Sequence, residues 1–263
     1  MSAEKLDRLL DDLRRSRGPA RGERPEAFDA RLASVTEALA DVPLFHGTDQ
    51  GHLQSIWDKG HLESRKTLGH IALDHQRCFD TYEAVYTSAG VMYPQRQVAF
   101  AFSRSIEQDA ELQIDGSPWD TGAFFRHVAP LLRLDTDEAK SSVFHAHTLG
   151  APWYRDYLVA YVATCFACAA DYLRSGAYAQ ADPAQVMSSR PNDFLLRVFE
   201  VRVRPRLPLE SRCILALFLP SPRYLTPSIA EHLCPVIEGS GVRIEYYGRP
   251  RGTVSRPTPP QTI

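Results

Sequence analysis

A single acidic residue in the middle of an apolar strand is the feature that most restricts the fold of this chain. The run Asp193–Val203 has a strong β-strand pattern, and Pro205 ends it. Because strand side chains alternate between faces, Glu200 shares one face with Arg202 and Arg204, while the other face is apolar. A carboxylate there is costly unless it faces a cleft or an ionic partner. The alternative is an edge-strand glutamate paired with a neighbouring arginine.

The other periodic segments predict a mixed α+β domain. A first strand at about 42–46 leads into a helix at about 50–59, and a helical region covers roughly 123–178. Further strands are expected at 84–88, 97–102, 214–219 and 242–247. This order of strand, helix, strands, helical insertion and strands is typical of an α+β fold. We expect two small sheets with a cleft between them.

We expect three parts along the chain. They are an N-terminal helical segment at 1–40, a main domain at 41–248 with a helical insertion at about 119–180, and a disordered tail at 249–263. The first part would hold two amphipathic helices, at 3–16 and about 26–40. The apolar stripe of the second helix consists of Phe28, Leu32, Val35 and Leu39. The segment would pack against the main domain or, alternatively, form a solvated appendage or a partner-binding arm.

The charge and hydropathy of the chain limit its partners. A formal net charge of −2 leaves no global basic field, so contact with nucleic acid needs a local basic patch. No apolar run reaches the roughly 18 residues of a membrane span, and the start of the chain is charged and lacks the apolar core of a signal peptide. We therefore expect a cytoplasmic protein that does not enter a membrane.

Two groups of potential metal ligands lack the spacing of known sites, and we expect no metal. Cys165 and Cys168 lie in an apolar helical stretch without a second ligand pair, which favours buried free thiols over zinc. The second group consists of His61, His70, His75 and Cys78. Its spacing fits no standard site, and a polar loop over a cleft is the simpler interpretation.

Two further motifs have the chemistry of a nucleotide site. The imidazole of His46 and the hydroxyl of Thr48 can hydrogen-bond a ribose, and Gly47 between them lets a ligand approach the backbone. Later, an aromatic strand leads into an arginine, in the run Phe100–Ser105. An aromatic platform beside a guanidinium suits a flat heterocycle next to phosphates. The alternative is that Phe100 and Phe102 are core residues and Arg104 is a strand-end charge. Tyr86 is another stacking candidate or, alternatively, packs in the sheet.

The order of these motifs resembles the ADP-ribosyltransferase fold, and most closely the DarT-type nucleic-acid ADP-ribosyltransferase toxins. Such enzymes open with a strand-end His-x-Thr and a helix ending in glycine, which Phe45–Thr48 and Ile56–Gly60 match. Their aromatic strand running into Arg-Ser is matched by Phe100–Ser105, and their catalytic Glu-Val/Phe-x-Val with a later Pro-x-Glu by Glu200–Val203 and Leu207–Glu210. The resemblance implies a split β-sandwich with N-terminal helices and a helical insertion.

The resemblance also implies that NAD is the substrate that supplies ADP-ribose. Glu200 would hydrogen-bond the ribose 2′-OH, stabilise the oxocarbenium-like sugar and take the acceptor's proton. Arg104 would assist it by holding a phosphate or orienting the acceptor. The implied NAD-binding residues are His46, Gly47, Thr48, Tyr86, Phe100, Phe102 and Ser103.

The sequence alone does not identify the acceptor of the ADP-ribose. Arg202, Arg204 and Arg206 could follow a phosphate backbone or could be a solvated strand end. The resemblance implies a DNA or RNA acceptor, a role as a toxin or phage-defence effector, and an antitoxin or other restraining partner. The alternatives are a protein acceptor, an inactive module that binds a nucleotide or partner, and an RNA 2′-phosphotransferase. Glu200 argues against the last, because that class relies on basic residues.

Overall fold

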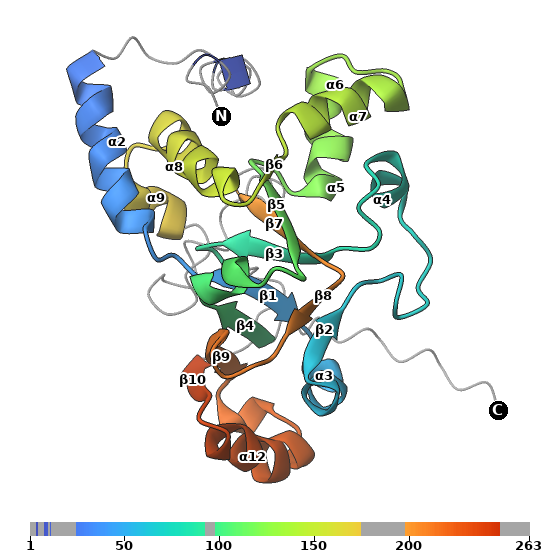
Figure 1. Cartoon of the computed structure of the whole chain (residues 1–263). Coiled ribbons are helices and arrows are strands. Elements are labelled where there is room, and N and C mark those ends of the chain that lie inside the picture. The colour runs from blue at the N-terminus through green and yellow to red at the C-terminus, as the bar shows by residue number, and fades with distance from the viewer. Residues whose placement is uncertain are drawn as a thin grey trace, which may run out of the picture.

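The computed structural model describes residues 4, 8, 9, 11, 25–92, 98–174 and 198–247. Within these residues the core is an eight-stranded mixed sheet in the order β10-β9-β4-β1-β3-β7-β5-β6, with β2 and β8 paired beside it (Figure 1). The strands are β1 (Leu44–Thr48), β2 (His61–Glu63), β3 (Val85–Ala89), β4 (Val98–Phe102), β5 (Gln113–Ser117), β6 (Leu149–Gly150), β7 (Glu200–Arg204), β8 (Arg206–Pro208), β9 (Ile214–Pro220) and β10 (Arg243–Tyr247).

Helices and short helical turns connect the strands. The helices are α2 (Pro25–Leu39), α3 (Leu53–Lys59), α4 (Asp74–Cys78), α5 (Thr121–Ala123), α6 (Ala129–Leu131), α7 (Asp137–Ala146), α8 (Trp153–Cys165), α9 (Ala169–Arg174) and α12 (Cys234–Gly239). The shorter or irregular turns are η1 (Gln50–His52), η2 (Arg104–Gln108), η3 (Phe124–Val128), η4 (Pro222–Tyr224) and η5 (Ser228–Leu233). None of the helices in these described ranges has the length and apolarity to cross a bilayer.

The large sheet divides into two halves between β1 and β3. β1 pairs with β4 along all of its residues, but it pairs with β3 only at Leu44 and Phe45. From His46 onward the two strands part, and the His46 ring nitrogen Nδ1 lies 2.8 Å from the Tyr86 carbonyl oxygen. The halves are therefore β10-β9-β4-β1 and β3-β7-β5-β6. The α+β class expected from the sequence is confirmed, but the two expected small sheets are halves of one sheet that stay joined at Leu44 and Phe45.

The apolar face of the second half packs against α8. The Phe199 ring, just before β7, contacts three aromatic residues of α8, namely Tyr154, Tyr157 and Tyr161. Gly116 of β5 makes this approach possible, because a Cβ there would lie 2.6 Å from the Phe199 ring. Apolar packing on this face leaves the charged face of β7 toward α5 and α7.

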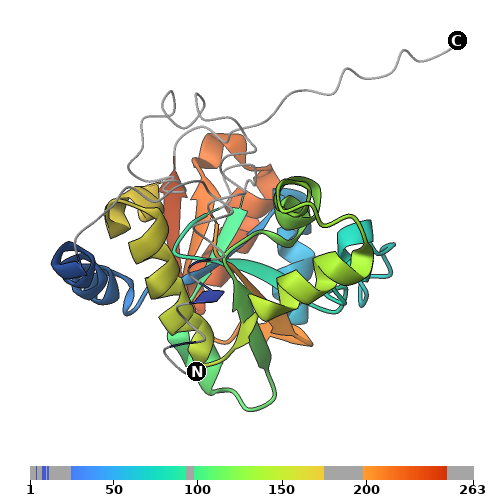
Figure 2. The same ribbon diagram turned by 90° about the horizontal axis from the view of Figure 1, so that it is seen from above.

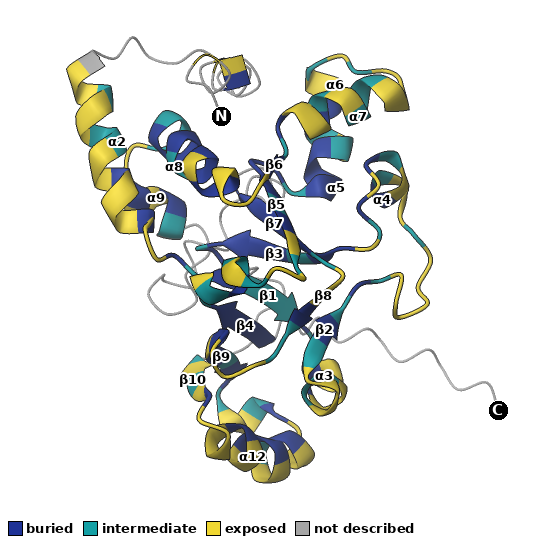
Figure 3. Cartoon of the chain, in the orientation of Figure 1, coloured by how far each residue is buried: buried dark blue, intermediate teal, exposed yellow. Residues whose placement is uncertain are grey.

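The second N-terminal helix packs on the outside of α8, as the sequence predicted. Val35 and Leu39 of α2 are buried, and Arg31 Nε donates a hydrogen bond to the Ala163 carbonyl oxygen at 2.6 Å. Seen from above, the blue α2 lies beside the yellow α8 and α9 (Figure 2). Its outer surface is exposed (Figure 3). The alternative of a solvated appendage is therefore wrong for this helix.

Other predictions change in detail or lie beyond the described residues. β5 was not predicted, because Asp115 and Gly116 are unfavourable in strands. α8 ends at Cys165, so Cys165 and Cys168 do not share a helix, and the expected burial is not found, because Cys165 is only partly buried and Cys168 is exposed. Most of the predicted helix at 3–16, the predicted strand residues 193–197 and the predicted disordered tail at 249–263 lie outside the described residues.

Candidate functional site

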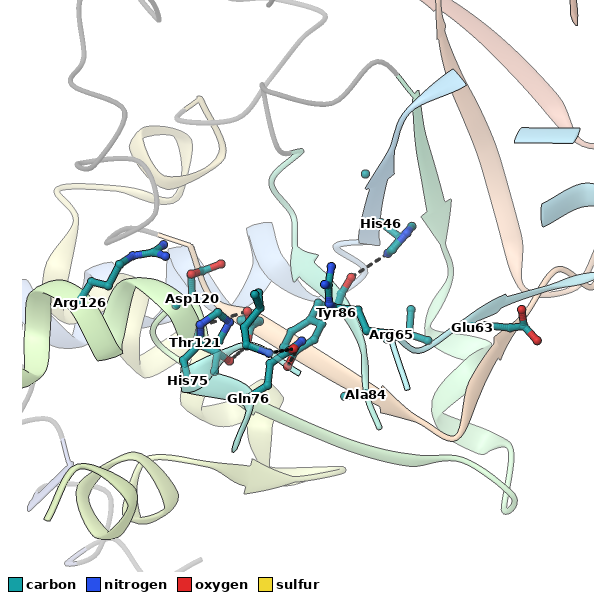
Figure 4. Close-up of a pocket in the computed structure, with 15 residues that line it drawn as sticks. His46, Glu63, Arg65, His75, Gln76, Ala84, Tyr86, Asp120, Thr121 and Arg126 are labelled. Carbon is teal, nitrogen blue, oxygen red and sulfur yellow. Dashed lines mark hydrogen bonds between the residues drawn. The ribbon is translucent and has the colours of Figure 1, made fainter. Parts of the chain in front are cut away.

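A pocket of about 420 Å³ lies where the two halves of the sheet part. Its lining comes from β1, β2 and the loop after it, α4, β3, the α5–η3 segment and β7 (Figure 4). His46 and Gly47 of β1 and Glu200 of β7 all line it. The structure therefore brings residues more than 150 positions apart in the sequence to one cavity.

Glu200 lies on an interior strand rather than at an edge. β7 is paired on both sides, and Glu200 is opposite Ser88 of β3 and Ser117 of β5. Its carboxylate is buried and accepts hydrogen bonds from the Thr121 backbone N–H at 3.2 Å, from the Thr121 hydroxyl and from Arg202 Nη1 at 3.1 Å. The edge position in the alternative interpretation is therefore wrong, although its pairing of Glu200 with Arg202 is confirmed.

The electrostatic surroundings of Glu200 give it a pKa suited to proton transfer. Burial raises the pKa of Glu200 to about 8, and the neighbouring carboxyl group of Asp120 contributes in the same direction. Arg202 and the two Thr121 donors oppose this rise. A carboxyl group that titrates near neutral pH and lines a cavity can act as a general base or acid.

The arginines of β7 pair with a carboxylate of the neighbouring strand instead of forming a basic surface patch. Arg202 is fully buried, donates through Nε to Asp115 Oδ1 at 2.6 Å and lies 4.8 Å from the centre of the Phe144 ring. Arg204 pairs with the second oxygen of the same carboxylate. Burial acts to raise the pKa of Asp115, but the two arginines hold that pKa below its ordinary value. The prediction that Arg202 contacts nucleic acid is therefore wrong, and Arg204 is already paired. Arg206 is exposed on β8, outside the pocket lining.

The residues of the His-Gly-Thr motif differ in their access to the pocket. His46 and Gly47 line it, whereas Thr48 is buried and is not part of the lining. Tyr86 of β3 also lines it, and its hydroxyl donates to the Thr81 carbonyl oxygen at 2.8 Å. Burial raises the pKa of Tyr86 to about 12, so its hydroxyl is neutral at physiological pH. Of the stacking candidates, Tyr86 alone lies at this pocket.

The aromatic strand and its arginine lie away from the pocket. Phe100 and Phe102 are fully buried in the core, with ring centres 6.2 Å apart. Ser103 caps η2 by accepting a hydrogen bond from the Ser105 N–H, and the half-exposed Arg104 donates to the Ala40 carbonyl oxygen at 3.0 Å. The predicted stacking and phosphate contacts of these residues are wrong at this pocket. β4 lies between β1 and β9 and is buried on both faces. The alternation of phenylalanine and alanine along β4 therefore does not mark a face that lines a cavity.

Three lining residues that the sequence did not single out as a group meet around Gly122. A Cβ at Gly122 would lie 3.2 Å from Arg126 Nη2, 3.3 Å from Asp120 Oδ1 and 3.4 Å from His75 Cε1. Asp120 also accepts a hydrogen bond from the Ala123 N–H at 2.8 Å, an N-cap pattern that the sequence could have revealed. Burial lowers the pKa of His75, which favours its neutral form. No cluster of three or more metal-ligand side chains occurs in the described part of the chain.

Comparisons with known proteins give a distant likeness in structure but no match in sequence. No family model matches the chain, and no curated protein matches its sequence. The solved structure of DarT from Thermus sp. 2.9 in complex with NAD+ is similar to it over 78% of this chain and 94% of that chain, with 12% sequence identity and a TM-score of 0.43. We therefore base the functional assignment on the residues of the pocket itself.

Proposed function

We propose that this chain is an NAD-dependent mono-ADP-ribosyltransferase. The observation that carries the proposal is that Glu200, buried on an interior strand, and His46, on the other half of the sheet, line the same pocket. A carboxylate is the group that cleavage of the nicotinamide–ribose bond needs, because positive charge develops on the ribose. The order of the His-Gly-Thr and Glu-Val-x-Val motifs supports the same assignment.

The charge distribution of the pocket suits a dinucleotide with a cationic and an anionic part. Glu63, Asp120 and Glu200 contribute acidic groups to the lining, while Arg65 and Arg126 contribute guanidinium groups. NAD has a positively charged nicotinamide ring and a negatively charged pyrophosphate. Opposite charges at opposite ends of a ligand can therefore be matched in one cavity.

The reaction follows from the position of Glu200. The bond between ribose C1′ and the nicotinamide nitrogen breaks, and its electron pair leaves with nicotinamide. Glu200 stabilises the oxocarbenium-like sugar electrostatically, and the acceptor's nucleophilic atom forms a new bond to C1′. Glu200 then takes the proton that the acceptor loses. Tyr86, which lines the same wall, is the stacking residue for the nicotinamide in this scheme.

We propose a nucleic acid, DNA or RNA, as the acceptor, with a role as a toxin or defence effector. The order of the motifs in the sequence supports a nucleic-acid acceptor. The arginines of β7 do not add support, because they do not form a basic patch. Modification of nucleic acid would harm the cell that makes the enzyme. A restraining protein partner is therefore part of the proposal.

Incubation with labelled NAD tests the function directly. Single-stranded DNA, RNA and a protein lysate are offered in turn to the wild type, to Glu200→Gln and to Glu231→Gln, an exposed control outside the pocket. We expect label transfer to a nucleic acid, lowered by about 10²–10⁴-fold in Glu200→Gln and unchanged in the control. Label transfer to protein alone would show that the acceptor is a protein rather than a nucleic acid. If no nicotinamide is released with any acceptor, the proposed transferase activity is refuted.

A further inference from the structure

Arg65 is a pocket residue whose hydrogen-bonding capacity is largely unused. It lies just after β2, and its buried Nε–H has no acceptor among the residues that the structure describes. Its Nη2 donates only a long, exposed hydrogen bond of 3.3 Å to the Ile71 carbonyl oxygen. A buried donor without an acceptor is energetically unfavourable. Arg65 therefore gains from any ligand that supplies an acceptor.

The charge of Arg65 is also uncompensated within the described ranges. Two acidic groups in this part of the chain already have partners. Glu63 pairs with Lys59 and lies 3.5 Å from His61 Nε2, and Glu83 pairs with Lys66. No ion pair of Arg65 itself occurs in this part of the structure. The guanidinium thus remains available to an anion in the pocket.

The loop that holds Arg65 is ordered by its own hydrogen bonds. The Thr67 N–H donates to Ser64 Oγ at 3.2 Å, and the Leu68 N–H donates to the Ser64 carbonyl oxygen at 3.1 Å. The His70 N–H donates to the Arg65 carbonyl oxygen at 3.0 Å. These bonds fix the backbone of Arg65 before a ligand arrives, which reduces the entropy lost on binding.

We propose that Arg65 is the anchor for a phosphate group of the ligand. A small rotation of its side chain into the cavity would present Nε and one Nη to two phosphate oxygens, in the bidentate geometry that guanidinium groups favour. In terms of the proposed function, on which this assignment of a source rests, the phosphate belongs either to the pyrophosphate of NAD or to the acceptor. Both are phosphate esters that carry the same oxygens.

Arg126 provides the contrast within the same pocket. It is exposed, lies on the Asp120 side of the pocket in Figure 4, and has its Nη2 beside Asp120 around the Gly122 position. A carboxylate therefore lies near its guanidinium group, and the residue is exposed to solvent. A substitution at Arg126 removes the same charge from the pocket without removing the buried donor.

Binding of inorganic pyrophosphate, measured by calorimetry, tests the anchor without any turnover. We expect Arg65→Gln to weaken the wild-type affinity about tenfold or more, and Arg126→Gln to weaken it less. Arg77→Gln, on α4 but outside this pocket, should leave it unchanged. Circular dichroism confirms that each variant is folded. Equal losses in Arg65→Gln and Arg126→Gln, or no binding by the wild type, would overturn the proposal.

Steady-state kinetics then identify the source of the phosphate. A raised KM for NAD in Arg65→Gln with an unchanged KM for the oligonucleotide assigns Arg65 to the pyrophosphate, and the reverse assigns it to the acceptor. Unchanged values for both substrates refute the anchor while leaving the transferase intact. Arg65-dependent pyrophosphate binding in a protein that never releases nicotinamide leaves the anchor intact while refuting the transferase.

Discussion

The two halves of the split sheet use similar strand patterns for different purposes. In the first half, β4 is buried on both faces, and Phe100 and Phe102 contribute only to the core. In the second half, the apolar face of β7 packs under α8, while its other face buries Glu200 and Arg202 beside the pocket. Alternation shows which residues share a face. It does not show whether that face meets core or cavity, which depends on the strands and helices around it.

The largest expected effect is a loss of stability when a buried charge in the second half of the sheet loses its partner. Asp115→Ala would leave Arg202 fully buried without its main carboxylate partner. We expect the free energy of unfolding to fall by about 3–5 kcal/mol, because an uncompensated buried charge is strongly unfavourable. Urea denaturation measures this loss.

A double variant sharpens this prediction. Asp115→Leu combined with Arg202→Met removes both charges, and we expect it to be more stable than Asp115→Ala. If the double variant is the less stable of the two, the ion pair is not what makes the single substitution costly.

The next largest effect is the pH dependence of catalysis. The pKa of Glu200 is raised to about 8 by burial, so a proton must leave before Glu200 can act as a base. We expect kcat/KM for NAD to rise about tenfold per pH unit below this pKa and to level off above it. A profile that is flat between pH 6 and 8 would show that ionisation of Glu200 does not limit the reaction.

Stability should follow the opposite trend over the same range. Because the folded-state pKa of Glu200 lies above its unfolded value of about 4.5, the native state binds more protons than the unfolded state between these two values. The contribution of Glu200 to stability is therefore present below about pH 4.5 and is lost as the pH rises toward 8. Glu200→Gln should remove this dependence in thermal unfolding measured across the range.

A smaller effect is expected in the first half of the sheet. Phe100→Leu keeps most of the buried volume, and we expect it to cost about 1 kcal/mol of stability and to leave KM for NAD unchanged. Thermal unfolding and steady-state kinetics measure the two quantities. An increase in KM for NAD out of proportion to the loss of stability would show that Phe100 contacts the ligand. The two halves of the sheet would then not differ in the way described above.

The smallest effect is expected from Gly122→Ala. The added methyl group would lie 3.2–3.4 Å from Arg126, Asp120 and His75. We expect a KM for NAD raised about two- to fivefold with stability almost unchanged, because the neighbouring side chains must shift by only a few tenths of an ångström. Gly239→Ala, where a Cβ meets nothing within 4 Å, is the matched control.

The sequence predicted the elements that local periodicity specifies. The order of the main strands, the packing face of α2 and the shared face of Glu200 and Arg202 all follow from periods of two or 3.6 residues. β5 escaped detection because Asp115 and Gly116 are poor strand formers on their own. Their places are set by Arg202 across the strand pair and by the approach of α8 to Gly116.

The rest of the pocket depends on contacts between distant segments. Arg65, His75 and Arg126 come from a loop, a short helix and an irregular turn. No local pattern links these residues. His46 and Glu200 were predicted individually, but their meeting results from the parting of β1 and β3 after Phe45. The basic run on β7 was misleading because Asp115, which pairs with both Arg202 and Arg204, lies on a strand that was not predicted.

A crystal structure with a non-cleavable NAD analogue would show whether one pocket in the split sheet holds the reacting ribose. We expect the nicotinamide ribose 2′-OH within about 3 Å of a Glu200 carboxylate oxygen, with the nicotinamide ring beside Tyr86. An analogue bound elsewhere, with Glu200 still contacting only Thr121 and Arg202, would contradict this expectation.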